Sequence, residues 1–418
     1  MEGWTPLPPE YEPSQRRLAE ERRAAGGAAS HNFAKPHAGL GGYRIFADGR
    51  DAYRRILARI GSATRRIEVR AFVWRDDDTG RSVARALLAA AERGVDVVIR
   101  KDRVAASYEY HGGTRQSLFH KNIKLGQRMQ TWFLDRAYAV RGPLAQQRCE
   151  EADALCAHPR VTIEHAHKRF DHAKVWVFDE AALILGGMGI GDDHHHEWVD
   201  FMVEVEGREA VERLNARLQT EAEFDADRTF DFLLHNRAKQ GIRLCPMLQS
   251  RLQLIASARK SLHIGMAYLG DSRFTQSLLA AVARGVDVTL VTSARADVMG
   301  NINRATCNTL LRRAAGPGNL IVRLHPRVVH AKAIVIDRRQ SDIGSANFTS
   351  LSHGIYDEVN LYVNDVGFAG QLADALERRA AEGRPLQQPM ATKKGVLLLE
   401  KAAVAYMSRR VGRSRHPL

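Results

Sequence analysis

Apolar residues recur along the chain with two periods, one typical of helices and one typical of strands. Residues 51–60 place apolar side chains at i, i+3, i+4 and i+7, the spacing of an amphipathic helix. Residues 66–73 then alternate apolar and polar positions, which predicts a strand. A second helix is expected over 79–93, with Gly94 just beyond its C-terminus, and the apolar run at 95–100 predicts the next strand.

The same succession of elements occurs again in the second half of the chain. The string Arg-Gly-Val-Asp-Val stands at 93–97 and at 284–288, each time after a segment rich in Ala and Leu. Such a match in matching context indicates an internal duplication. Strands that alternate with helices predict α/β architecture, so we expect two similar lobes over 41–235 and 236–390, with sheets flanked by helices and related by a pseudo-two-fold axis.

Three segments lie outside this repeat. Residues 1–40 are rich in Pro, Ala and Gly and are expected to form a flexible tail. The first copy carries an insertion within 103–165, where aromatic residues mix with Lys and Arg. This insertion is either an element that shapes a substrate site or faces a membrane, or a surface subdomain with a small core of its own. Residues 391–418 form a basic amphipathic segment, which either lies in a membrane interface or docks on the body of the protein.

Charge and composition restrict the expected class of binding partner and the expected cellular compartment. The 418-residue chain has a formal net charge of +14, which favours an anionic partner, either a phospholipid surface or nucleic acid. No run of about 18 apolar residues predicts a membrane-spanning helix, and the N-terminus lacks the apolar core of a signal peptide. We therefore expect a cytoplasmic protein that associates peripherally with the inner face of the cell membrane.

A duplicated motif carries the candidate chemistry. The pattern His-x-Lys-x-x-x-x-Asp occurs twice, each copy leads into a Gly-rich turn, and each is followed by a carboxylate 28 residues after its His. Duplication of these groups predicts one composite site between the lobes, suited to phosphate chemistry without a metal or another cofactor. The residues concerned are His172, Lys174, Asp179 and Asp200 in the first copy, and His330, Lys332, Asp337 and Glu358 in the second.

Each residue type has a task in such a site. In a strand, a His and the Lys two positions later project from the same face, so the imidazole can attack phosphorus while the ammonium neutralises the phosphate oxygens. Asp200 and Glu358 would each accept an N–H from a His and fix its tautomer. Asp179 and Asp337 are expected to be structural, capping the turns into Gly186 and Gly344. The triplet His194–His196 is expected to form a polar loop at the edge of the site rather than a metal centre.

These residues resemble the phospholipase D superfamily, whose motif His-x-Lys-x4-Asp is followed by Gly-Ser-x-Asn. The second copy matches in full, with Gly344, Ser345 and Asn347, whereas the first has Gly187 and Gly189 at the Ser and Asn positions. The segments that begin at 72 and at 93 are also similar to bacterial cardiolipin synthases, and the resemblance covers about residues 42–385.

The resemblance implies two phospholipase D-type α/β lobes with the active site at their interface. It implies that His172 is the phosphohistidine nucleophile and His330 the general acid and base, with Gly187, Ser345 and Asn347 in the phosphate-positioning turns. The expected activity is phosphatidyl transfer of the cardiolipin synthase type to phosphatidylglycerol or another alcohol. The alternatives are a phospholipase D-type hydrolase, a phosphodiesterase or endonuclease acting on nucleic acid, and a degenerate scaffold without activity.

Overall fold

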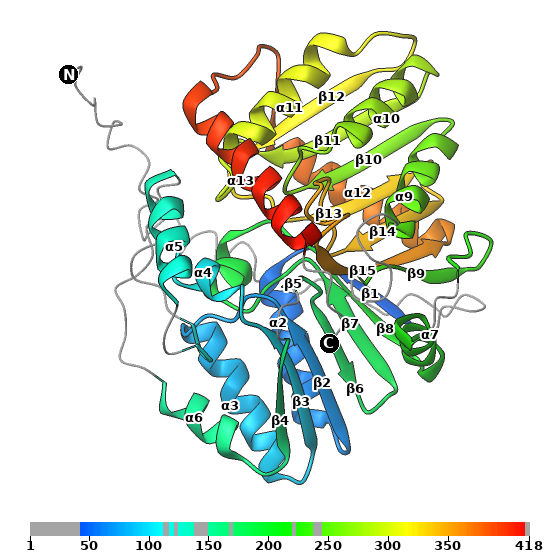
Figure 1. The fold of residues 1–418 in the computed structure, drawn as a ribbon. Helices are drawn as coiled ribbons and strands as arrows, with labels where there is room; N and C mark the ends of the chain where they lie inside the picture. The colour runs from blue at the N-terminus through cyan, green and yellow to red at the C-terminus, as the bar shows by residue number, and fades with distance from the viewer. Residues whose placement is uncertain are drawn as a thin grey trace, which may run out of the picture. The chain divides into compact units, whose positions relative to one another are not determined.

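The computed structural model describes residues 42–111, 117–120, 124–137, 149–166, 170–219, 223–236 and 245–413. The expected tail over 1–40 lies outside these residues. The described part contains two mixed sheets flanked by helices, which confirms the expected α/β class (Figure 1).

The first sheet has seven strands in the order β1-β8-β7-β6-β2-β3-β4. The run β2-β3-β4 is parallel, and the pairs from β2 through β6, β7 and β8 to β1 are antiparallel. In sheet order, the strands are β1 (Tyr43–Phe46), β8 (Met202–Glu206), β7 (Ala182–Gly186), β6 (Val175–Phe178), β2 (Arg66–Ala71), β3 (Asp96–Asp102) and β4 (Val161–Ala166).

Two amphipathic helices pack on this sheet, as the apolar periodicity predicts. Helix α2 (Gly49–Ser62) is capped by the Asp48 carboxylate, and α3 (Asp78–Glu92) by that of Asp77, each accepting a backbone N–H of the first turn. Gly94 follows α3 with φ +97°, a left-handed conformation that favours glycine. The residues buried beneath the helices belong to one core with those of the sheet.

The second sheet has the path β16-β12-β11-β10-β13-β14-β15-β5, with β9 also paired to β15. Both β5 and β9 precede residue 236, so two strands from the range expected for the first lobe belong to the second sheet. In path order, the strands are β16 (Arg384–Pro385), β12 (Leu320–His325), β11 (Asp287–Ser293), β10 (Ser261–Met266), β13 (Lys332–Ile336), β14 (Gln340–Gly344), β15 (Tyr356–Asn364) and β5 (Phe170–Asp171), followed by β9 (Phe230–His235).

Helices of the second half repeat the arrangement of the first. The unit β10-α10-β11 corresponds to β2-α3-β3, and Gly285 follows α10 with φ +94°, as Gly94 follows α3. A second buried core lies between this sheet and its helices. These helices are α9 (Pro246–Ser257), α10 (Ser272–Ala283), α11 (Gly300–Arg313) and α12 (Val366–Glu382). Helix α7 (Arg208–Gln219), which precedes them in the chain, contacts β7 and β9.

The insertion and the C-terminal segment both form helices. Between β3 and β4 the chain adds α4 (Ala106–Glu109), α5 (Leu125–Ala137) and α6 (Glu150–Ala157), of which α6 packs on α3. The last helix, α13 (Lys394–Arg413), packs on α11, and the Glu400 carboxylate accepts the backbone N–H groups of Asn301 and Ile302 (Figure 1). Within the described ranges, no helix combines the length and the apolar sequence that crossing a bilayer requires.

Candidate active site

Short stretches of paired backbone join the two halves at the motif histidines. The His172 N–H donates to the Asp357 carbonyl at 2.9 Å, beside the parallel pairing of β5 with β15. In the other half, the His330 N–H donates to the Val199 carbonyl at 2.7 Å, next to a parallel bridge between Val199 and Val329. Each histidine therefore lies alongside the acid-bearing segment of the opposite half.

Each motif histidine is paired with the distal carboxylate of the opposite half. Nδ1 of His172 lies 3.0 and 3.1 Å from the two carboxylate oxygens of Glu358, and Nδ1 of His330 lies 2.7 Å from Oδ2 of Asp200. All four side chains are buried. An Nδ1–H donated to a carboxylate leaves Nε2 with its lone pair, so each ring presents a basic nitrogen on its other side.

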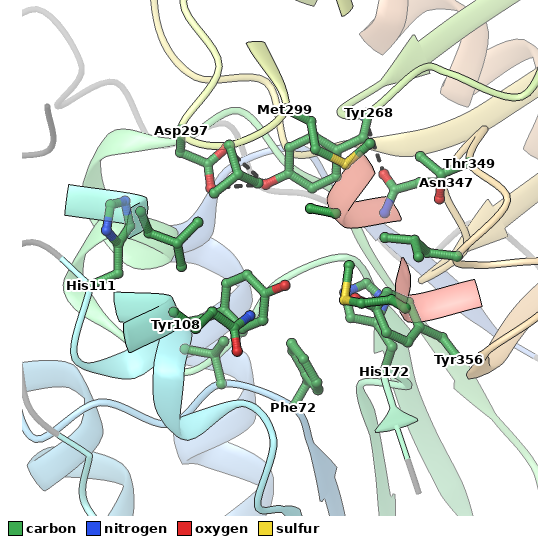
Figure 2. A pocket seen from close by; sticks show the side chains of 18 of the residues that line it. Phe72, Tyr108, His111, His172, Tyr268, Asp297, Met299, Asn347, Thr349 and Tyr356 are labelled. Carbon is green, nitrogen blue, oxygen red and sulfur yellow. Dashed lines mark hydrogen bonds between the residues drawn. The ribbon is translucent and has the colours of Figure 1, made fainter. Parts of the chain in front are cut away.

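Both histidines line one cavity of about 780 Å³. Aromatic rings hold them in place from the opposite half: Tyr356 stacks on His172 at 5.1 Å, and Trp198 lies 5.2 Å from His330, measured between ring centroids. Phe72 adds an edge contact to His172 at 4.9 Å. Figure 2 shows Phe72, His172 and Tyr356 together on one side of this cavity.

The motif lysines lie beside their own histidines. Nζ of Lys174 donates to the His172 carbonyl at 2.5 Å, and Nζ of Lys332 donates to the His330 carbonyl and lies 2.7 Å from His330 Nδ1. The histidines themselves precede strands β6 and β13 rather than lying within them. The expectation that each His occupies a strand is thus wrong in detail, because these positions pair with the opposite half instead of continuing the sheet.

Burial weakens the basicity of all four motif groups. Desolvation, with the neighbouring lysine ammonium groups as a further contribution, lowers the pKa of His172 to about 4 and that of His330 well below its ordinary value. Desolvation also lowers the pKa of Lys174 to about 7 and of Lys332 to about 8. Both imidazoles are therefore neutral at neutral pH, while nearby carboxylates favour the charged form of both lysines.

The two carboxylates differ in acidity. Burial raises the pKa of Asp200 to about 6, against the opposing effect of Lys332. Burial acts the same way on Glu358, but His172, Lys174 and the Ser345 hydroxyl outweigh it and hold the pKa of Glu358 below its ordinary value. Glu358 is the more firmly ionised of the two and is better suited to stabilise a positive charge on its histidine.

The motif residues Asp179 and Asp337 lie away from the cavity. Each has φ near +50° and accepts three backbone N–H groups, at Thr64, Arg65 and Arg66 for Asp179 and at 259–261 for Asp337. They cap the chain where it enters β2 and β10, and do not cap the turns into Gly186 and Gly344 as the sequence had suggested. The structural interpretation is retained, with different partners.

The Gly-rich turns differ between the halves. Ser345 donates its hydroxyl to Glu358 at 2.5 Å, whereas a Cβ at Gly187 would lie only 2.2 Å from Oδ1 of Asp200. The shorter Asp side chain keeps its carboxylate close to the turn, so glycine is required there. Asn347 lines the cavity, and its Oδ1 accepts the Tyr268 N–H at 3.3 Å.

The triplet His194–His196 does not form an edge loop. It lies in a π-helical turn, Asp193–Glu197, which buries His194 in the cavity wall beside His330. The expected loop is instead a π-helical turn, and this turn buries the His194 side chain. Donor atoms of His194, Asp200 and His330 lie within 4.8 Å of one another, a separation compatible with a metal ion, but the hydrogen bond between Asp200 and His330 already explains their proximity.

Three cavity residues have no motif and were missed from the sequence. The Tyr268 hydroxyl donates to both carboxylate oxygens of Asp297 at 2.7 and 2.8 Å, and His111 Nδ1 lies 2.9 Å from Asp135. Nε2 of His111 is buried without a hydrogen-bond partner among the described residues. Figure 2 shows Asp297 and Tyr268 on the wall that faces Tyr108, so this end of the cavity is polar.

Helices α5 and α13 line the cavity with apolar side chains. Met129 and Leu134 come from α5, and Val404 and Met407 from α13. The insertion therefore contributes to the wall of the site, and the C-terminal helix docks on the body of the protein while one of its faces reaches the cavity.

Two histidines oriented by buried carboxylates, two lysines and one shared cavity between duplicated lobes define an enzyme of the phospholipase D type. The comparisons narrow this class. Residues 56–221 and 252–380 match the family described as "Cardiolipin synthase, PLD-like domain", and the chain belongs to this family, within the phospholipase D superfamily.

Individual relatives agree with this assignment. The chain is 25% identical over 363 residues to cardiolipin synthase A of Pseudomonas entomophila (strain L48), covering 82% of this chain and 69% of that protein. It is 23% identical over 386 residues to cardiolipin synthase B of Escherichia coli (strain K12), covering 87% and 86%. Phosphatidylserine synthase of Haemophilus influenzae Rd KW20 superposes with a TM-score of 0.63 at 15% identity, over 94% of this chain and 99% of that structure, which confirms the two-lobed fold.

Proposed function

We propose that this enzyme transfers a phosphatidyl group through a phosphohistidine at His172 to phosphatidylglycerol or another alcohol. The observation that carries the proposal is the pair of imidazoles on one cavity, each oriented by a carboxylate from the other half. One such group suffices for a nucleophile, and two allow a nucleophile and an acid–base catalyst to serve the same phosphorus atom.

The first step forms the covalent intermediate. His172 donates Nδ1–H to Glu358, and its Nε2 lone pair attacks the phosphorus atom of the donor lipid. The bond from phosphorus to the leaving alcohol oxygen breaks, and His330 gives that oxygen its proton. The bound phosphate anion offsets the burial that lowers the pKa of His330, so the ring can hold this proton when substrate is present.

The second step runs the same chemistry in reverse with a new alcohol. Neutral His330 takes the proton of the acceptor hydroxyl, whose oxygen attacks phosphorus. The P–N bond then breaks, and its electron pair returns to Nε2 of His172. Throughout both steps the ammonium groups of Lys174 and Lys332 neutralise the charge on the phosphate oxygens.

Electrostatics favours His172 over His330 as the nucleophile. The intermediate places a positive charge on the phosphorylated imidazole, and a firmly ionised carboxylate stabilises that charge. The pKa of Glu358, the partner of His172, is held below its ordinary value, whereas burial raises that of Asp200, the partner of His330, to about 6.

The cavity suits a lipid with a polar headgroup. Apolar side chains of α5 and α13 line one part of it and suit acyl chains. Asp297 and Nε2 of His111, which has no hydrogen-bond partner within the part of the chain that the structure describes, lie at the polar end, where they can accept hydrogen bonds from headgroup hydroxyls.

The proposal is tested by incubating the purified protein with vesicles of labelled phosphatidylglycerol. Formation of cardiolipin and an equal amount of free glycerol is the expected result. Release of phosphatidic acid instead would identify water as the acceptor. In parallel, single- and double-stranded DNA are offered, and cleaved DNA with untouched lipid would replace the proposal by a nuclease activity.

The acidity of the site predicts a bell-shaped dependence of kcat/KM on pH. Asp200, with a pKa of about 6, must be ionised to orient His330, so activity should fall as pH drops below about 6. Lys174 and Lys332, with pKa values of about 7 and about 8, must keep their protons, so activity should fall again as pH rises through that range. The acid limb should disappear in Asp200→Asn, measured on its residual rate. A flat profile from pH 5 to 9 in the unaltered enzyme would contradict the assigned groups.

We further propose that α5 and α13 bring the enzyme to the inner face of the cell membrane as a peripheral protein. Both helices line the cavity and also expose large apolar side chains, Leu125, Met129 and Trp132 on α5 and Leu398, Leu399 and Tyr406 on α13. Exposed basic residues accompany them, namely Lys124, Arg128, Lys394 and Lys401. Apolar side chains beside cations are typical of a surface that enters an anionic bilayer.

Replacing Leu398 and Leu399 together by Asp should weaken binding to phosphatidylglycerol vesicles by about tenfold or more, because two apolar contacts with lipid are lost and two negative charges are added. Co-sedimentation with vesicles measures the effect. Val366→Asp is the matched control, since Val366 is equally exposed but lies on α12, outside the cavity. Equal losses in both variants would refute this docking surface.

A further inference from the structure

We propose that His194 binds the substrate phosphate in the first half of the site, in the place that Asn347 holds in the second. This inference rests on the proposed function, because it concerns the same phosphorus-centred site. It assigns a phosphate-binding role to a residue outside both motif copies.

At two pairs of matching positions, the halves differ in which position carries the larger side chain. His330 lies 158 residues after His172, and the same offset relates Gly189 to Asn347 and His194 to Ser352. The first half therefore combines Gly with His, where the second combines Asn with Ser. The backbone is equivalent at this point, since Ile190 bridges to Trp74 as Phe348 bridges to Leu269.

His194 fills the space that an Asn at 189 would need. A Cβ built on Gly189 would lie 2.7 Å from Nε2 of His194, closer than real Cβ contacts allow, and it would also lie 3.1 Å from Cδ2 of His194 and 3.2 Å from Cβ of Val73. The matching position in the second half holds the smaller Ser352, whose hydroxyl accepts the Asn347 N–H at 3.1 Å. The π-helical turn Asp193–Glu197 carries His194 into this space.

The surroundings of His194 point to a ligand rather than to packing alone. Its ring lies 4.8 Å from that of His330 and 4.5 Å from that of Trp198, and it lines the same cavity as both motif histidines. The side chain is 2% exposed, yet Nδ1 has no hydrogen-bond partner among the described residues. Buried polar atoms are nearly always paired, so an unpaired one at a reaction cavity marks a place for a bound group.

A neutral imidazole can donate one N–H to a phosphate oxygen, as an amide can. Burial lowers the pKa of His194 well below its ordinary value, so the ring is uncharged and does not compete with His330 for a proton. With the Asn347 amide on one side and the His194 ring on the other, a phosphate between the two motif histidines has a donor from each half. Such donors act most strongly when charge builds on the oxygens in the transition state.

The test uses three variants and two readouts. The first readout is turnover of bis(p-nitrophenyl) phosphate, which needs no lipid. The second is binding of orthovanadate, a mimic of the transferring phosphoryl group, followed by calorimetry. We expect His194→Ser to lower kcat about 100-fold and to weaken vanadate binding by a similar factor. Gly189→Asn alone should also be impaired, because the amide meets the His194 ring.

The decisive variant is the double substitution Gly189→Asn with His194→Ser, which gives the first half the residues of the second. Its kcat and its affinity for vanadate should each be at least tenfold higher than those of His194→Ser. A purely structural role of His194 predicts no such recovery. His196→Ser is the matched control, since His196 is exposed and absent from the cavity wall, and it should behave like the unaltered enzyme.

Unchanged turnover and vanadate binding in His194→Ser would overturn the inference, as would a folded double variant that is no better than the single one. Its failure is separable from failure of the proposed function. An enzyme that cleaves the chromogenic diester but ignores phosphatidylglycerol would refute phosphatidyl transfer and leave the role of His194 testable. Vanadate binding decides the matter even where neither substrate turns over.

Discussion

His172→Ala should lower phosphatidyl transfer by about 10⁴-fold to 10⁶-fold, because in the proposed mechanism it removes the atom that forms the covalent intermediate. His330→Ala should lower transfer to glycerol-type acceptors by a comparable factor, since the leaving alkoxide and the acceptor hydroxyl both depend on it. Loss of activity alone does not distinguish the two roles. A donor lipid with a p-nitrophenol headgroup does, because that leaving group needs no proton.

With this donor, His330→Ala should release about one p-nitrophenol per enzyme in a rapid burst and then stall, since the intermediate forms but the acceptor is not activated. His172→Ala should give no burst. The stalled His330 variant should carry the labelled phosphatidyl group on a histidine, in the acid-labile and alkali-stable form of a phosphoramidate. A burst in His172→Ala with none in His330→Ala would reverse the two roles.

Glu358→Gln should lower kcat by about 10³-fold to 10⁴-fold. The geometry of the site should change little, because the amide is isosteric with the carboxylate. Its NH₂ group would favour the wrong tautomer of His172, whose Nδ1 lies 3.0 Å from the carboxylate, and the positive charge of the intermediate would lose its counter-charge. Steady-state rates and the size of the p-nitrophenol burst measure this effect. The burst itself should slow, because Glu358 assists the first step.

Asp179→Asn is a matched control for this prediction, since Asp179 belongs to the motif but lies away from the cavity. Its carboxylate accepts three backbone N–H groups where the chain enters β2, so the substitution should lower the melting temperature and leave kcat unchanged. If Glu358→Gln kept its rate, or if Asp179→Asn lost its rate at a temperature where it is folded, the division between catalytic and structural motif residues would be wrong.

Local patterns predicted the elements of this fold because their causes are local. The apolar spacing of α2 and α3, the caps at their ends and the repeated Arg-Gly-Val-Asp-Val string all depend on residues within a few positions of one another. The motif spacing likewise marked the six motif residues and the two distal acids. The lobe boundary expected at residue 235 does not reveal that β5 and β9 pair with β15 in the second sheet, because these partners lie more than a hundred residues apart in the chain.

Parts of the site could not be predicted from local sequence patterns, because they too depend on residues far apart in the chain. The sequence proposed that each acid orients a histidine but did not say which one, and the exchange between halves depends on pairing across 186 and 130 residues. His194 is expected in an edge loop, and only the π-helical turn seen in the structure places it in the cavity wall. Asp297 and Tyr268 carry no pattern at all, and only the docking of the two lobes places them on the cavity.

Each motif histidine is paired with the acid of the other half. The proposed catalysis therefore depends on the interface between the lobes and not on either lobe alone. The carboxylate that orients each imidazole comes from the other half, so a slight separation of the sheets would misorient both rings together. Thermal inactivation should therefore be abrupt and should precede the melting of either sheet. A lobe produced by itself would lack the acid partner of its histidine and should be inactive.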